Sequence, residues 1–135
     1  MTEKLKIGID IDNTINVSKQ TVGLFVLLTH ALKDKAEIHI ITNRDTSERS
    51  RKETVTELEG YGIHYDSLMI TSNKYKYIMD NDITVFFDDT DEAFLDLPSS
   101  ITVFKIREPG NFDFTKGVHK WIYGNKTGIN IDDRK

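Results

Sequence analysis

Residues 6–15, Lys-Ile-Gly-Ile-Asp-Ile-Asp-Asn-Thr-Ile, decide the fold class and point to the chemistry. The apolar residues Ile7 and Ile9 lead directly into Asp10 and Asp12. An apolar run that ends in polar residues predicts a buried strand followed by its carboxyl edge. That edge is where open α/β sheets bind their ligands. Two carboxylates there can hold a hard cation, and one of them can attack a phosphorus atom.

The rest of the chain alternates between short apolar runs and amphipathic stretches. Strands are predicted at residues 5–9, 37–41, 67–71, 83–87 and 101–106. Helices are predicted at 18–33, from 46 or 47 to about 60, at 74–79, at 90–97, and from 113 or 115 through 121. Strands that alternate with helices favour βαβ units. The predicted fold is therefore α/β, a three-layer α/β/α sandwich around a Rossmann-like, mainly parallel sheet of five strands.

The length of 135 residues predicts one domain with one substantial core. We expect the core to occupy residues 1–123. Residues 124–135 form a polar segment that we expect to be a loosely held tail, although 128–132 could pair as an edge strand. The chain shows no internal repeat and no low-complexity segment.

Composition excludes several classes of function. The net charge of −4 argues against nucleic-acid binding through bulk charge. There is no cysteine, which excludes disulfides, thiolate nucleophiles and thiolate zinc sites. The longest apolar run is far too short to cross a bilayer, and no signal peptide is evident. We therefore expect no membrane partner and a cytoplasmic location.

Polar side chains follow the other predicted strands as well. Thr42, Asn43 and Arg44 come after the second strand, and Lys74 opens the helix after the third. The pair at 88–89, two aspartates, ends the fourth strand. Because the carboxyl ends of parallel strands meet at one edge, we expect these groups to share a crevice.

The residue types in this crevice suit phosphoryl transfer. A cluster of carboxylates repels itself and needs a divalent cation, and Mg²⁺ prefers carboxylate oxygens. With the cation bound, Asp10 can attack phosphorus and Asp12 can protonate the leaving group. Thr42 can hold phosphate oxygens, Lys74 can neutralise their charge, and Arg44 can pair with them bidentately.

In these motifs the chain resembles the haloacid-dehalogenase (HAD) superfamily of phosphatases. The four motifs occur in the family order: Asp10-x-Asp12-x-Thr14, Thr42, Lys74, and Asp88-Asp89. The resemblance implies a phosphate monoester as substrate and an aspartyl-phosphate intermediate on Asp10. It also implies Mg²⁺ held by Asp10, the backbone carbonyl of Asp12, and Asp88 or Asp89. Thr14, Asn43 and Arg44 are the expected substrate-binding residues.

Many family members carry a cap domain, but only 31 residues separate Asp10 from Thr42, and 31 separate Thr42 from Lys74. Predicted helices and strands fill both gaps, so we expect a capless, open site. Such a site suits a nucleic-acid end or a protein, and it suits a small phosphate if a second subunit covers it. Small nucleotidase-like proteins and polynucleotide phosphatase domains resemble the chain equally.

Three alternatives stay open from the sequence alone. Lys76 lies two residues from Lys74 and is the competing site lysine. Either member of the Asp88–Asp89 pair is a candidate metal ligand. The competing function is a non-catalytic relative that binds phosphate or a protein partner. A receiver domain is rejected, because its phosphorylated aspartate would end the third strand, where this chain has Met69-Ile-Thr-Ser.

Overall fold

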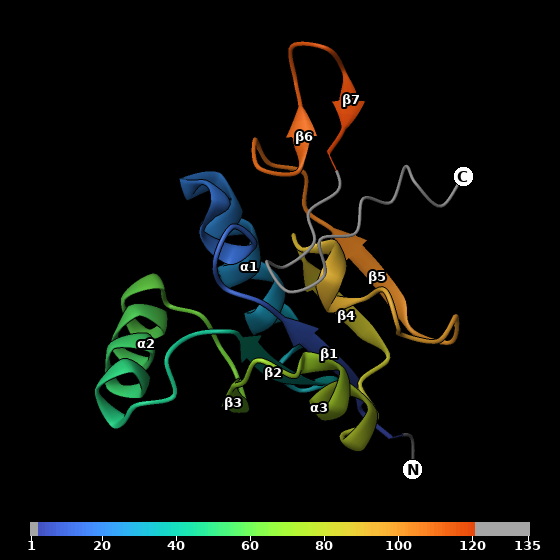
Figure 1. Cartoon of the computed structure of the whole chain (residues 1–135). Helices are drawn as coiled ribbons and strands as arrows, with labels where there is room; N and C mark the ends of the chain where they lie inside the picture. Colours follow the sequence, from blue (N-terminus) through green and yellow to red (C-terminus); the bar gives the residue numbers. More distant parts are fainter. Residues whose placement is uncertain (1–2, 121–135) are drawn as a thin grey trace.

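A five-stranded parallel sheet forms the centre of the protein in the computed structural model, which describes residues 3–120 (Figure 1). The strand order is β3-β2-β1-β4-β5, and all four strand pairs are parallel. The strands are β1 (Leu5–Ile9), β2 (Ala36–Thr42), β3 (Ser67–Ile70), β4 (Val85–Asp88) and β5 (Thr102–Lys105). The predicted α/β fold and its parallel, Rossmann-like sheet are confirmed.

Three α-helices connect the strands: α1 (Lys19–Leu32), α2 (Glu48–Tyr61) and α3 (Lys74–Asp80). Each begins at a residue whose side chain caps the first turn. Ser18 accepts from Thr21 N, Ser47 accepts from Ser50 N, and Asn73 accepts from Lys76 N. A short 3-10 helix, η1 (Ile15–Val17), precedes α1 and was not predicted.

The two faces of the sheet pack against different helices, which gives the three layers (Figure 1). One face buries Ile7, Ile9, Ile38 and Ile40 under apolar residues of α1 and α2. The opposite face buries a second cluster of Ile41, Ile78, Ile83 and Phe86 against α3. The alternation along each strand follows from the two-residue period of side chains in a sheet.

Gly8 marks a tightly packed point on the α3 face of the sheet. A Cβ at this position would lie 2.9 Å from Ile41 Cδ1 and 3.0 Å from Phe86 Cδ1. Both atoms belong to core side chains that have little room to move. The glycine in the β1 motif is therefore a packing requirement of the strand that carries Asp10.

The predicted last helix is wrong over the described residues. Residues 112–119 form a two-stranded antiparallel hairpin of β6 (Phe112–Asp113) and β7 (Val118–His119). The Asp113 carboxylate accepts from the backbone N–H groups of Thr115 and Lys116, and Gly117 has a φ of +69°. These are turn interactions that compete with a helix start, so the residue expected to cap a helix opens a turn.

The segment after β4 differs less from its predicted structure. The helix expected at 90–97 is only a 3-10 turn, η2 (Asp91–Ala93). Its carboxylate Asp91 is fully buried and paired with Lys105 from β5. The expected tail from residue 124 onward lies outside the described residues. Among residues 3–120, no helix is both long and apolar enough to cross a membrane.

Candidate metal and phosphate site

Three buried aspartates meet where the strand order changes direction. Asp10 follows β1, Asp88 ends the adjacent strand β4, and Asp89 comes directly after it. One carboxylate oxygen from each lies within 4.8 Å of the others, and all three residues are buried. A parallel sheet binds ligands at this switch point because the connections on either side diverge there and leave a crevice.

Lys74 is the counter-charge of this cluster. It is the first residue of α3, and its Nζ lies 3.1 Å from Asp10 Oδ1 and 2.7 Å from Asp88 Oδ2. Lys76, by contrast, is exposed and pairs with Asp80 one helical turn away. The structure therefore brings Lys74, not Lys76, to the acids.

The raised pKa values of two of the aspartates indicate that the negative charge of the cluster is only partly neutralised. Burial raises the pKa of Asp10 to about 6, with Lys74 lowering it and Asp88 raising it. Burial and the charges of Asp88 and Asp10 raise the pKa of Asp89 to about 7. Burial alone would lower the pKa of Lys74, but its two carboxylate partners raise it above its usual value. One ammonium thus does not neutralise three carboxylates.

A divalent cation fits this donor set. Three close carboxylates with one lysine carry a net charge of about −2 when ionised, and a bound Mg²⁺ would offset it. Mg²⁺ takes oxygen ligands and keeps waters or a phosphate oxygen in its remaining positions. Thr14 contributes indirectly, since its buried hydroxyl donates to Asp89 Oδ1 at 3.4 Å.

Thr42 supplies a polar atom that suits a ligand. It ends β2, beside β1, and is fully buried. Its hydroxyl makes no hydrogen bond to any residue in the described part of the chain. A buried hydroxyl without a partner costs about 1–3 kcal/mol, so such groups are rare unless a ligand or water completes them. A phosphate oxygen would complete this one.

Asp12 lies outside the acid cluster and faces Arg44. The guanidinium donates from Nε to Asp12 Oδ2 at 2.9 Å and from Nη2 to Oδ1 at 2.7 Å. This bidentate pair holds the pKa of Asp12 below its usual value. Asn13, with a φ of +58°, turns the chain between Asp12 and Thr14, as the residue type allows.

The Nη1 donors of Arg44 are engaged by α2. Nη1 donates to Thr54 Oγ1 at 3.1 Å and to Glu57 Oε1 at 2.8 Å, and Tyr61 donates to Glu57 Oε2 at 2.7 Å. Arg44, expected to bind substrate, therefore uses four of its five N–H donors to link Asp12 to α2. Asn43, the other expected substrate-binding residue of this segment, is exposed.

The sequence interpretation missed the buried side chain of Asn111. Its Nδ2 donates to the carbonyl oxygens of Asp89 and Ile106, both at 2.8 Å, and its Oδ1 accepts from Glu108 N at 2.9 Å. Pro109-Gly110-Asn111 predicts only a turn, and nothing in that pattern identifies a buried amide. Asn111 fixes the peptide that carries one of the candidate metal ligands.

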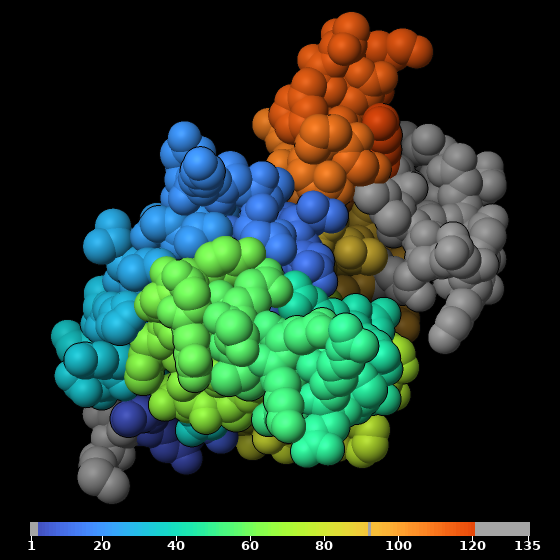
Figure 2. Space-filling view, turned by 90° about the vertical axis from the view of Figure 1, so that its left-hand side faces the viewer, coloured from blue at the N-terminus to red at the C-terminus, as the bar shows by residue number. Residues whose placement is uncertain are grey.

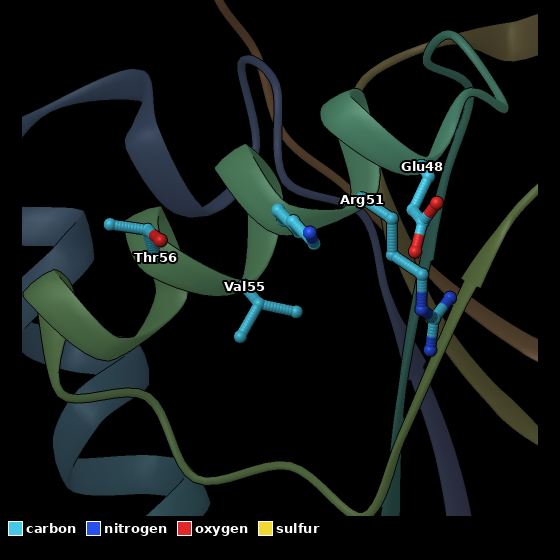
Figure 3. A pocket seen from close by; sticks show the side chains of 5 residues that line it. Glu48, Arg51, Val55 and Thr56 are labelled. Carbon is cyan, nitrogen blue, oxygen red and sulfur yellow. The ribbon is translucent and has the colours of Figure 1, made fainter.

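The protein also has a surface hollow on α2, and none of the residues that line it belongs to the acid cluster. It is lined by Glu48, Arg51, Lys52, Val55 and Thr56 (Figure 3). Arg51 is tied to Leu68 O at 3.3 Å, and the set contains one acid and two bases. With a single carboxylate, the hollow lacks the set of acids that could hold a divalent cation at the sheet edge.

Comparison with known proteins adds a likeness in fold. Neither a protein-family model nor a curated protein matches the sequence. A chain in the solved structure of the "Pnkp1/Rnl/Hen1 complex" superimposes with a TM-score of 0.59 at 15% identity. The match covers 78% of this chain and 47% of that one, so this chain spans about half the length of its structural neighbour. At this identity, the likeness concerns the fold alone.

Proposed function

We propose that this protein is a Mg²⁺-dependent phosphatase of the HAD type, with a capless core at residues 1–123, that hydrolyses a phosphate monoester. The observation that carries the proposal is the buried cluster of Asp10, Asp88 and Asp89 with Lys74 at the switch point of the sheet. The α/β fold and the orphan hydroxyl of Thr42 support it. A bound Mg²⁺ would neutralise phosphate and carboxylate charge.

In the proposed reaction, the Asp10 carboxylate attacks the phosphorus atom and the bond to the leaving oxygen breaks. The products are an acyl phosphate on Asp10 and an alkoxide that takes a proton. Water, losing a proton to a base, then attacks the same phosphorus and releases Asp10 and inorganic phosphate. Thr42 and Lys74 are proposed to hold the phosphoryl oxygens.

Asp12 is the proposed acid and base for these two proton transfers. Its pairing with Arg44 keeps it ionised, which suits the second step, in which a carboxylate takes a proton from water. Donation of a proton in the first step requires that this pairing weaken once substrate is bound. We therefore assign Arg44 as a positioning residue for Asp12.

The proposal is tested by phosphate release from a panel of monoesters, with Mg²⁺ or with EDTA. The panel includes nucleoside 5′- and 3′-monophosphates, oligonucleotides phosphorylated at either end, sugar phosphates and a phosphopeptide. We expect turnover of at least one member, reduced at least ~100-fold by EDTA because the acid cluster then lacks its cation. Folded protein that binds Mg²⁺ but turns over no member would instead favour the non-catalytic binding module.

The substitution Arg44→Lys distinguishes two roles for Arg44: positioning of Asp12 and direct binding of phosphate. Lysine keeps the positive charge but cannot make the bidentate contact with Asp12 while also reaching Thr54 and Glu57. If Arg44 positions Asp12, kcat should fall about 10- to 100-fold with KM nearly unchanged. The steady-state parameters on the best panel substrate give this result.

A rise in KM with kcat preserved would contradict this positioning role and return Arg44 to direct phosphate binding. Arg49→Lys is the matched control, since Arg49 is exposed and pairs with Glu53 on its own helix. We expect this control to behave as the wild type.

A further inference from the structure

The hairpin of β6 and β7 stands beyond the carboxyl edge of the sheet, the edge that carries the acid cluster (Figures 1 and 2). It presents unusually apolar side chains to solvent. Phe114 is 59% exposed and Val118 is 50% exposed. The proposed function gives neither residue a role.

The aromatic residues of the hairpin form a small cluster with a guanidinium. The ring centroids of Phe112 and Phe114 lie 4.8 Å apart, and the Arg107 guanidinium carbon lies 4.1 Å from the Phe112 centroid. Lys116 and Lys120 are exposed on the same hairpin. Aromatic faces and arginine planes beside basic groups are what nucleobases and their phosphates bind.

The root of the hairpin is fixed to the loop that carries the acids. On one side, the Asn111 side chain holds the carbonyl of Asp89, and Phe112 is the next residue. On the other side, His119 Nε2 lies 2.9 Å from Lys105 Nζ and 3.6 Å from Asp91 Oδ2. Both strands are thus tethered within two residues of Asp89. Phe114 follows Asn111 by three residues, so its Cα lies at most roughly 11 Å from that of Asn111.

We propose that this hairpin is a stacking platform for a nucleobase of the substrate, with Phe114 as its exposed face. The inference rests on the proposed function and narrows it: the substrate is a nucleotide or the terminal nucleotide of a strand. Phosphate bound at the acids would direct the rest of the molecule outward across the open edge. Among the residues described, Phe114 on the anchored hairpin has the most exposed aromatic side chain, at 59% against 49% for Phe104 and 44% for Tyr75.

The test uses Phe114→Leu and Phe114→Tyr with three probes: a nucleoside monophosphate, a 3′-phosphorylated oligonucleotide, and ribose 5-phosphate. Leucine keeps the apolar character but lacks a π-face, whereas tyrosine keeps the ring. Phe114→Leu should lower kcat/KM for the base-bearing probes about 5- to 100-fold and leave ribose 5-phosphate within twofold. Phe114→Tyr should restore the wild-type preference. The first two probes distinguish a free nucleotide from a strand end.

A binding measurement keeps this inference separate from the proposed function. The affinity of the Asp10→Asn variant for each probe is measured by calorimetry with Mg²⁺, with and without Phe114→Leu. If Phe114→Leu lowers the affinity for the base-bearing probes, the stacking platform is supported even when no probe is hydrolysed. Absence of hydrolysis would then contradict the phosphatase proposal and not the platform. Equal effects on nucleotide and ribose 5-phosphate, or no effect on either, overturn the platform and leave any observed phosphatase activity standing. Unchanged thermal melting excludes unfolding.

Discussion

Asp10→Asn should lower phosphate release by at least ~10³-fold and leave the fold intact. The amide has nearly the shape of the carboxylate, so it can still accept a hydrogen bond from Lys74. It is not a nucleophile, and no acyl phosphate can form on it. Loss of a group that forms a covalent intermediate costs far more than loss of a binding contact. Initial rates with the best panel substrate and Mg²⁺ measure the effect.

The control for this substitution is Asp80→Asn. Asp80 is exposed at the end of α3 and contacts Lys76, so it tests the removal of a carboxylate outside the cluster. We expect wild-type rates from this variant. Retention of more than a tenth of the activity by Asp10→Asn would show that Asp10 is not the nucleophile, while equal loss in both variants would indicate a general effect on the protein.

The carboxyl edge of the sheet could be predicted because its signals are local. Ile7 and Ile9 lead into Asp10, and Val85 to Phe87 lead into the acids at 88–89, so each pattern contains both the strand and its end. The cap at Asn73 likewise identifies Lys74 as the first residue of a helix. Once the strands are known to be parallel, the meeting of these groups follows from topology.

The pairing of Asp12 with Arg44 could not be predicted in this way. The two residues lie 32 positions apart, and their contact joins the segments that follow β2 and β1. An arginine after a strand suits a bound phosphate as well as a neighbouring carboxylate. The positions of Thr54 and Glu57 on α2, which accept from Nη1 of the guanidinium, favour the carboxylate as its partner.

The hairpin was mispredicted because local and periodic signals compete there. Asp113 and Thr115 are good helix caps, and the basic and apolar residues that follow are compatible with a short helix. Gly117 and the alternation of Phe112, Phe114 and Val118 favour a turn between strands instead. The tethers at Asn111 and His119 add tertiary contacts that a local pattern does not contain.

Lys74→Met should destabilise the metal-free protein by about 3–5 kcal/mol, the usual effect of breaking a buried ion pair on one side. The substitution keeps an apolar side chain of similar length but leaves Asp10 and Asp88 buried without their counter-charge. Since the pKa of Asp10 is already raised to about 6, the acids should take up protons more readily in the variant, and its instability should lessen toward pH 5. Chemical denaturation in EDTA at pH 7.5 and pH 5 measures both effects.

Added Mg²⁺ should restore part of the stability of Lys74→Met but not its activity. A divalent cation among Asp10, Asp88 and Asp89 supplies the missing positive charge, because ligands that bind the native state stabilise it. It does not replace an ammonium aimed at the phosphoryl oxygens, so kcat should stay about 10²- to 10³-fold below the wild type. Lys76→Met is the control, and its exposed pair with Asp80 should make no measurable difference. Equal stability of the two variants in EDTA would mean that Lys74 does not neutralise the acids in solution, and it would remove the electrostatic basis for a metal site.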